Sequence, residues 1–555
     1  MPTGEVAGGP TPAGPAQDPT ANRAALEPVV AALRANDLPT AKRLARQALE
    51  RGLEHPMLLN LRALEAEEAG MLKQALADLR RAHLLAPRDF AILNACGLTL
   101  ARMERYNEAL NCYDQALSIE PGFGPAWFNR GWALERVGEK GQAAQAYAKA
   151  VELSPDNVLA WASMAFLNAS RGEVENARRQ AERALQLQPG FPTALLALAA
   201  AEMHQPAAAE RRLNDLLNVK LSHYDRGLAL GLLGDALDAQ NRPAEAFAAY
   251  TASNVALREE VAPRFETAGQ PTIAATVLRL VHWAQSLDPK AWRSEPASSA
   301  GGQAGHVFLM GFPRSGTTLI ESVLGQHPDI VTLEERETLH DSVLAFLSDP
   351  KDIAELAGAP ESRLRPLRED YWARVAQLGA ETKGKVFIDK NPFSTLKLPV
   401  ILKLFPNARI LFAIRDPRDV VLSCFRRRFN INPSTYEYLD LARTARNYDG
   451  TMQLADLLRA KLQFAEHQLV YERLIENFED EARALCGFIG VEWRPDLIDF
   501  ANRAKRGEVA SASAAQIARG LYADGSGHWR RYQAQLTPVL PVLEPWVRRF
   551  GYPPE

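Results

Sequence analysis

Small residues recur every 34 positions through the first half of the chain. One column of alanines runs through positions 75, 109, 143 and 177, another through 82, 116, 150 and 184, and a third column reads Ala63, Gly97, Gly131 and Ala165. Prolines 87, 121, 155 and 189 keep the same period. Small side chains let two antiparallel helices approach closely, and a proline cannot continue a helix. The period therefore predicts helical pairs stacked one upon the next.

This pattern resembles the tetratricopeptide repeat family, whose unit is a helix–turn–helix. The best matches are repeats at 56–89, 90–123, 124–157 and 158–191, extended back by a repeat at 22–55 and forward, after a shortened unit, by one at 227–260. The resemblance implies an α superhelix with a concave face that binds a peptide or protein. An array that only caps or scaffolds the next domain is an equally weighted alternative, because periodicity reports stacking and not ligands.

The pattern changes in the second half, where short apolar runs at 307–312, 385–389 and 408–415 alternate with helical segments. Runs of this length predict buried strands of a parallel sheet, and therefore an α/β domain. We predict four segments: a disordered tail at 1–21, the repeat array at 22–260, a helical connector and Gly/Ser-rich linker at 261–305, and the α/β domain at 306–555.

Composition narrows the functional classes. Hydrophobic residues make up 47% of the 555 residues and charged residues 24%, which is ordinary for globular proteins. The net charge of -3 gives no broad basic surface, so we expect no nucleic-acid partner. No stretch approaches the roughly 18 apolar residues of a membrane span. Four scattered cysteines without a C-x-x-C pair favour a reducing compartment and no metal site, and we expect a cytoplasmic protein.

The chemistry begins where the strand at 307–312 runs into the segment Gly311-Phe-Pro-Arg-Ser-Gly-Thr-Thr-Leu319. A strand, a tight glycine turn and a helix N-terminus form a P-loop-like anion site, because backbone N–H groups and the helix dipole favour negative charge. Arg314 adds a guanidinium, and Ser315, Thr317 and Thr318 add hydroxyls around Gly316. The frame resembles GxxxxGK[ST], but Thr317 replaces the lysine that grips the phosphates of a nucleoside triphosphate. That replacement argues against a kinase.

The loop looks like the 5′-phosphosulfate loop of sulfotransferases that use 3′-phosphoadenylyl sulfate. In that family an arginine at the end of a later strand and a serine eight residues on bind the 3′-phosphate, and Arg415 and Ser423 match this spacing. Arg427 matches a further family arginine, and Tyr471 matches a tyrosine that contacts the nucleotide. The resemblance implies that the fold is an α superhelix of tetratricopeptide repeats followed by an α/β sulfotransferase domain.

Arg415 and Arg427 lie in a basic run that also has a simpler explanation. A solvated basic face accounts well for Arg426 and Arg428. It accounts poorly for Arg415, which follows an apolar strand at its carboxyl end, where α/β domains bind their ligands.

The whole segment 306–550 is most similar to the tyrosylprotein sulfotransferases and to bacterial tetratricopeptide-repeat sulfotransferases. That resemblance implies Glu335 as the catalytic base, with Lys390 and Ser513 as stabilisers of the transition state. The reaction needs a base at the acceptor hydroxyl and cations at the leaving oxygen. Glu334 is expected to face elsewhere. His327 and His340 are competing bases, and His327, which precedes a proline, is better explained as a structural residue.

Two positions depart from the family. His528 stands where the family has a nucleotide-binding lysine, and we expect it to contact the nucleotide in that place. Glu337 stands where the animal enzymes carry an arginine for acidic peptides. We therefore predict a sulfotransferase that uses 3′-phosphoadenylyl sulfate and no metal, with a protein tyrosine among its candidate acceptors. A repeat-based interaction scaffold with an idle nucleotide domain is the alternative. The identity of the acceptor and the oligomeric state stay open.

Overall fold

The structure is a computed structural model, and it describes residues 19–267, 272–292, 302–499 and 526–554. It divides into two compact units. One comprises the described residues up to Asn168 together with Arg179–Pro189, and the other comprises Ala169–Arg178 and the described residues from Gly190 onward. The last helical pairs therefore belong to the same unit as the sheet, whereas the sequence suggested a boundary near residue 260.

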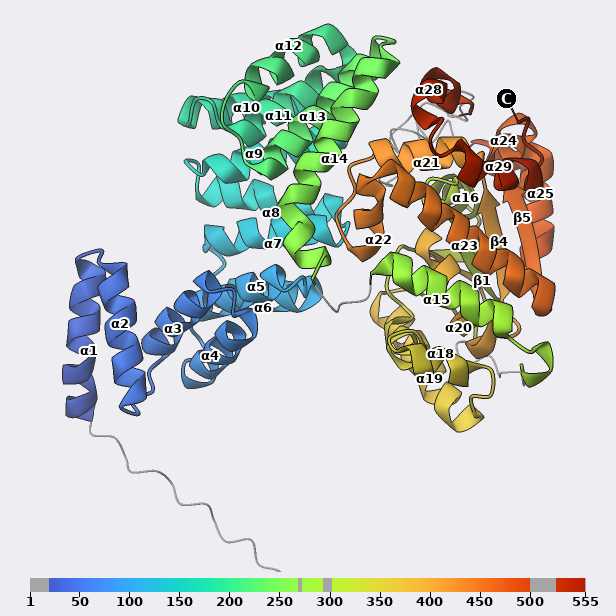
Figure 1. Ribbon diagram of the computed structural model, residues 1–555. Coiled ribbons are helices and arrows are strands. Elements are labelled where there is room, and N and C mark those ends of the chain that lie inside the picture. The colour runs from blue at the N-terminus through green and yellow to red at the C-terminus, as the bar shows by residue number, and fades with distance from the viewer. Residues whose placement is uncertain (1–18, 268–271, 293–301, 500–525, 555) are drawn as a thin grey trace, which may run out of the picture. The chain divides into compact units, whose positions relative to one another are not determined.

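The first half consists of helices joined in pairs by short turns (Figure 1). The pairs are α1 (Pro19–Arg34) with α2 (Leu38–Glu50), α3 (Pro56–Glu68) with α4 (Leu72–Leu85), α5 (Phe90–Arg102) with α6 (Tyr106–Ile119), α7 (Gly124–Arg136) with α8 (Lys140–Leu153), α9 (Val158–Ser170) with α10 (Val174–Leu187), α11 (Pro192–Ala201) with α12 (Pro206–Leu217), and α13 (His223–Ala239) with α14 (Pro243–Phe265). This confirms the predicted helical repeats, including the shortened unit. Helix α1 begins three residues inside the predicted tail, whose residues 1–18 lie outside the described part.

The small-residue columns lie where paired helices meet. Ala75, Ala109 and Ala143 are fully buried. A Cβ added at Gly131 of α7 would come within 2.7 Å of the Tyr147 ring of α8. A larger side chain there would push the two helices apart, so the 34-residue period is a direct consequence of close helix packing.

The second half contains a five-stranded parallel sheet in the order β2-β3-β1-β4-β5. The strands are β1 (Gly305–Gly311), β2 (Ile330–Glu334), β3 (Val386–Lys390), β4 (Arg409–Ile414) and β5 (Ala465–Val470). The three central strands, β3, β1 and β4, confirm the three predicted strands, and their ends agree with the predicted ends within two residues. The two edge strands were not predicted, because their sequences, IVTLE and AEHQLV, mix polar with apolar residues and are only partly buried.

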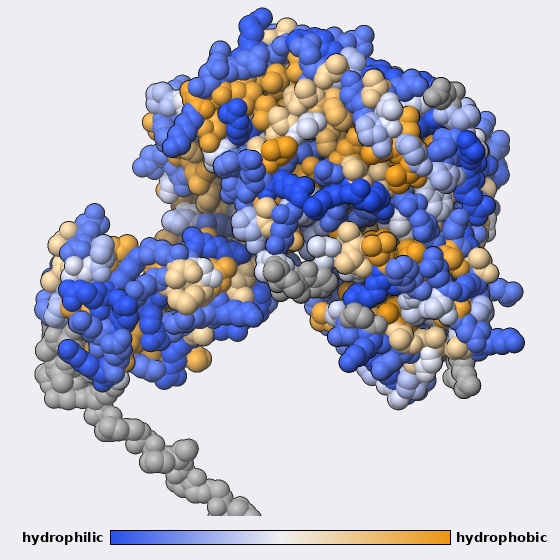
Figure 2. All heavy atoms as spheres, viewed as in Figure 1, coloured by the Kyte–Doolittle hydropathy of each residue, from blue (hydrophilic) through white to orange (hydrophobic). Residues whose placement is uncertain are grey.

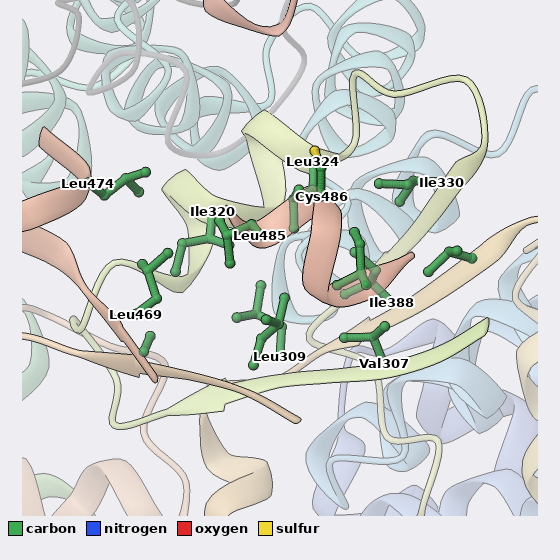
Figure 3. Close-up of a cluster of buried hydrophobic side chains, with 14 of the residues drawn as sticks. Val307, Leu309, Ile320, Leu324, Ile330, Ile388, Leu469, Leu474, Leu485 and Cys486 are labelled. Atoms are coloured by element: carbon green, nitrogen blue, oxygen red, sulfur yellow. The ribbon is translucent and has the colours of Figure 1, made fainter. Parts of the chain in front are cut away.

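Apolar side chains cover both faces of the sheet. On one face, Val307, Leu309 and Ile388 pack against Ile320 of α16 (Thr317–Leu324) and Leu485 of α25 (Phe478–Ile489), as Figure 3 shows. On the other face, aromatic rings from the strands pack against α19 (Glu361–Gln377) and the end of α20 (Leu398–Leu404). Burial on both faces is typical of parallel sheets, and it leaves the strand ends as the place for polar chemistry.

The remaining helices surround this core (Figure 1). They are α15 (Ile273–Ser286), α17 (His340–Phe346), α18 (Pro350–Leu356), α21 (Pro417–Arg426), α22 (Pro433–Tyr436), α23 (Leu441–Lys461), α24 (Tyr471–Glu476), α28 (Gln533–Leu536) and α29 (Leu540–Arg549). Helix α15 supplies the helical part of the predicted connector. Hydrophilic residues cover much of the face shown in Figure 2. Within the described ranges, no helix is both long and apolar enough to cross a membrane.

Candidate active site

The carboxyl ends of the five strands bring the predicted site residues to one edge of the sheet. Arg314 follows β1, Glu335 follows β2, Lys390 ends β3, Arg415 follows β4 and Tyr471 follows β5. These residues span 158 positions from Arg314 to Tyr471, yet parallel pairing places all five strand ends together. Ligands of open α/β sheets bind at this edge, so it is the candidate active site.

The loop between β1 and α16 is shaped to face an anion. Gly316 has φ +95° and immediately precedes α16, whose first N–H groups have no acceptor within the helix. A Cβ at Gly316 would come within 2.5 Å of Cδ2 of Tyr471, so only glycine fits between the loop and this ring. Ser315 and Thr317 are buried beside it. The predicted strand–loop–helix is therefore formed, and anion binding by it stays a prediction.

Three arginines gather around this loop. The Arg314 Nε donates a hydrogen bond to Ser423 Oγ of α21 at 3.0 Å, and Arg415 Nη1 donates to the Arg314 carbonyl oxygen at 3.1 Å. The Arg415 guanidinium also lies 4.8 Å from the centre of the Tyr471 ring. Burial, followed by the positive charges of Arg427 and Arg415, lowers the pKa of Arg314 to about 10. Cations that repel one another in this way favour a bound anion with several negative charges.

A second group of charges surrounds Lys390. Its Nζ donates to Glu334 Oε1 and Glu335 Oε1, both at 2.9 Å, and lies 3.3 Å from Glu321 Oε2. The Lys390 side chain is fully buried, whereas the side chains of Glu334 and Glu335 are 41% and 48% exposed. Burial disfavours the charged amine, but the three carboxylates outweigh it and raise the pKa of Lys390. Lys390 is therefore a fixed positive charge beside two carboxylates that reach solvent.

The backbone at Glu335 is strained. Its φ is +48°, and its N–H donates to the Lys390 carbonyl oxygen at 2.7 Å. Among the described residues from 302 onward, the non-glycine residues with positive φ are Arg314 and Glu335. This conformation costs a non-glycine residue on the order of 1–3 kcal/mol and is found preferentially at functional sites. Its occurrence at these two positions supports a functional role for both.

The turn that follows Glu335 is held in place by a buried carboxylate. Asp389 Oδ2 accepts hydrogen bonds from Thr338 Oγ1 at 2.7 Å and from the Tyr371 hydroxyl at 3.0 Å. The Tyr371 hydroxyl also lies 2.9 Å from His306 Nε2. Burial raises the pKa of Asp389 to about 6. Asp389 precedes Lys390 in β3, so the strand that presents the lysine also fixes the turn that carries Glu335.

Two predictions from the sequence are wrong. Glu334 does not face away from the site, because it contacts Lys390 at the same distance as Glu335. Arg426 and Arg428 are not a solvated basic face, since each forms an ion pair with an aspartate of α13. Sequence analysis also missed Glu321. The available signal was a lone acidic residue between Ile320 and Val323 on an otherwise uncharged helix.

The other predicted residues lie as follows. His327 is buried, with Nε2 2.9 Å from the Glu492 carbonyl oxygen and Nδ1 accepting from the Asp329 N–H, which fits the structural role expected for it. His528 lies beside Arg426 and Asp238, and its contact with the nucleotide stays a prediction. Ser513 lies outside the described residues. No group of three or more metal-ligating side chains occurs in the part of the chain that the structure describes.

Comparison with known proteins identifies two regions. Residues 306–495 match the profile of the sulfotransferase family, and residues 95–158 match that of the tetratricopeptide repeat. An uncharacterised protein of Aquifex aeolicus (strain VF5) is 28% identical over 256 residues, which is 44% of this chain but only 33% of that protein. Protein-tyrosine sulfotransferase 1 of Danio rerio is 24% identical over 261 residues, or 45% of this chain and 72% of that protein.

Solved structures of repeat proteins also resemble the chain. A tetratricopeptide repeat protein from Parabacteroides merdae is 18% identical, covers 42% of this chain and 93% of its own, and has a TM-score of 0.34. The type IV pilus biogenesis factor PilW is 20% identical, covers 39% of this chain and 95% of its own, and has a TM-score of 0.32. With the helical pairs and the parallel sheet described above, the profile matches show that the chain joins tetratricopeptide repeats to a domain of the sulfotransferase family.

Proposed function

We propose that this protein transfers the sulfuryl group of 3′-phosphoadenylyl sulfate to a hydroxyl group of an acceptor, with a protein tyrosine as the first candidate. The observation that carries the proposal is the geometry at the edge of the sheet. There, the ends of β1 and β4 bring Arg314 and Arg415 together, and the ends of β2 and β3 bring Glu335 to Lys390. A donor with two phosphate positions and a reacting hydroxyl needs both groups side by side.

The donor would be held by its two anionic ends. The loop after β1, with the N-terminus of α16, suits the 5′-phosphosulfate, because backbone N–H groups face the anion there. Arg415, Ser423 and Arg427 suit the 3′-phosphate, since guanidinium groups form charge-assisted hydrogen bonds with phosphate oxygens. Arg314 lies in the loop after β1 and contacts Ser423 and Arg415 of the 3′-phosphate group, so it would couple the two phosphate positions.

The reaction would proceed by in-line attack. The acceptor oxygen forms a bond to sulfur while the bond between sulfur and the bridging phosphate oxygen breaks, and adenosine 3′,5′-bisphosphate leaves. Glu335 would take the proton of the acceptor hydroxyl, since its carboxylate is half exposed and fixed by Lys390. Lys390 would offset the negative charge that grows on the bridging oxygen. Ser513 would add a hydrogen bond to this oxygen.

The proposed acceptor class rests on two supports. Relatives of this domain in Danio rerio and Caenorhabditis elegans are named protein-tyrosine sulfotransferases. The repeat array is also of a kind that binds peptides or proteins. A protein acceptor would therefore have a place to bind outside the domain that performs the chemistry. Glu337, which pairs with Lys397 at 2.8 Å, disfavours strongly acidic peptides next to Glu335.

The test is transfer of labelled sulfate. The full chain is incubated with labelled 3′-phosphoadenylyl sulfate and tyrosine peptides, glycans, phenols or lipids, and the labelled product is identified by mass. Lys390→Ala should abolish transfer, while the control Lys397→Ala, which removes a lysine outside the cluster around Lys390, should retain it. Tight binding of adenosine 3′,5′-bisphosphate without transfer to any acceptor would favour the interaction-scaffold alternative.

A further inference from the structure

The C-terminal end of α21 is bound by the last helical pair of the repeat array. Arg426, the final residue of α21, donates from Nη2 to Asp238 Oδ2 of α13 at 2.5 Å. Its guanidinium lies 5.0 Å from the ring centre of Tyr250 of α14 and 5.3 Å from that of Tyr532. The Tyr532 hydroxyl donates to the other carboxylate oxygen of Asp238 at 2.6 Å. Both partners of the ion pair are largely buried, with side-chain exposures of 19% and 11%.

A second ion pair forms two residues further on. Arg428 Nη2 donates to Asp235 Oδ2 of α13 at 2.5 Å, and the Tyr250 hydroxyl donates to Oδ1 of the same carboxylate at 3.0 Å. The arginine side chain crosses α13 at Gly231, where an added Cβ would come within 2.7 Å of Arg428 Cδ. Helix α13 therefore provides both the Asp235 carboxylate and, at Gly231, the space that the Arg428 side chain needs.

A side chain of α14 binds the backbone at the same end of α21. The Asn254 side chain donates from Nδ2 to the Phe425 carbonyl oxygen at 2.9 Å, and both groups are buried. The last carbonyl groups of a helix lack partners within the helix, so this bond acts as a cap supplied by another element. The Phe425 ring stacks on Phe247 of α14 at 5.2 Å. We call Asp235, Asp238 and Asn254, with their three partners on and after α21, the α21 anchor.

The anchored segment carries the residues assigned to the donor. Ser423 lies two residues before Phe425, and Arg427 lies between the two anchored arginines. The Arg427 N–H donates to the Ser423 carbonyl oxygen at 3.1 Å, so the two residues belong to one rigid turn. Cys424 in the same turn contacts the Pro313 carbonyl oxygen in the loop after β1. A shift of this turn would therefore move Ser423 and Arg427 together.

We propose that the α13–α14 pair is part of the donor site, with Asp235 and Asp238 as positioning residues that act on the 3′-phosphate through Ser423 and Arg427. The inference rests on the proposed function, because the proposed function assigns Ser423 and Arg427 to the donor. Without the anchor, Arg426 and Arg428 would be left as partly buried charges without their carboxylates, and the turn would rearrange to solvate them. The last repeat then belongs functionally to the catalytic domain.

The test uses the full chain with both aspartates replaced, Asp235→Asn and Asp238→Asn, which keeps shape but removes charge. Glu202→Gln is the matched control, because Glu202 forms a similarly buried ion pair with Arg212 at 2.6 Å, between η1 (Glu202–His204) and α12. Calorimetry measures the Kd for adenosine 3′,5′-bisphosphate, and hydrogen exchange monitors the peptide that covers residues 420–430. Arg428→Gln alone supplies the same test should the double variant fail to fold.

We expect the double variant to weaken nucleotide binding at least fivefold and to speed exchange in 420–430, while the control changes neither. In a chain that already carries both Ser423→Ala and Arg427→Ala, the double variant should weaken binding less than twofold, since its effect passes through those two residues. Unchanged affinity, or full additivity with Ser423→Ala and Arg427→Ala, would overturn the inference. A wild-type chain that does not bind the nucleotide would instead refute the proposed function.

Discussion

Replacing Glu335 by glutamine tests the assignment of the base most sharply. The substitution Glu335→Gln keeps the side-chain length and an oxygen that can accept a hydrogen bond from Lys390 Nζ, which lies 2.9 Å from the wild-type carboxylate. It also leaves the backbone conformation at φ +48° no more strained than before. Only the negative charge and the ability to take a proton are lost.

The size of the effect separates the two roles that Glu335 could have. A positioned general base contributes about 10²–10⁴-fold, which corresponds to about 3–5 kcal/mol in the transition state. A half-exposed ion-pair partner contributes only about 0–1 kcal/mol, and Lys390 would still have Glu321 and Glu334 beside it. A loss of turnover above a hundredfold therefore cannot come from the ion pair alone.

The assay is single-turnover transfer from labelled 3′-phosphoadenylyl sulfate, with Glu334→Gln as the matched comparison. Glu334→Gln removes a carboxylate at the same 2.9 Å from Lys390, and it should slow transfer less than about tenfold. The Glu335→Gln defect should shrink with phenols of low pKa, which are already partly ionised. Normal transfer by Glu335→Gln with an inactive Glu334→Gln would refute the assignment, and equal losses would show that both carboxylates act only through Lys390.

Four further substitutions have definite expected outcomes. Arg415→Ala should weaken adenosine 3′,5′-bisphosphate binding by about 1.5–3 kcal/mol, and Ser423→Ala by less, when both are measured by calorimetry; unchanged affinity in both would place the 3′-phosphate elsewhere. Gly316→Ala should weaken the same binding and lower Tm, because the new methyl group would press on the ring 2.5 Å away. Asp389→Asn should flatten the pH dependence of stability. Its pKa is raised to about 6 from 3.8 by burial, so the wild type loses about 2 kcal/mol as pH rises from 4 to 6, and the variant should not lose this in denaturant titrations.

The sequence predicted the features that depend on regular spacing. The 34-residue period predicted the helical pairs, since each small residue sits where two helices touch. The apolar runs predicted the three central strands, because a strand buried on both faces consists mostly of apolar residues. The glycine at Gly316 and the arginine at the end of β4 marked the candidate anion site through local chemistry alone.

The features that the sequence could not predict depend on contacts between distant segments. Glu321 reaches Lys390 across 69 positions of sequence, and the pairing follows only from the strand order. Asp238 and Arg426 are 188 residues apart, and neither lies in a pattern that names its partner. Basic residues in a row are usually solvated, so the sequence gives no sign that Arg426 and Arg428 are paired. The pairing follows only from the space beside Gly231 and the carboxylates of α13.

The central claim is that the edge of the sheet binds a 3′-phosphorylated adenosine nucleotide through arginines and backbone N–H groups, without the lysine of a nucleoside triphosphatase. Titration calorimetry of the full chain tests it directly by comparing adenosine 3′,5′-bisphosphate in the presence of a chelator with ATP in the presence of magnesium. We expect adenosine 3′,5′-bisphosphate to bind more tightly, and Arg415→Ala to reduce this preference. Tighter binding of magnesium ATP by the wild-type chain would contradict it.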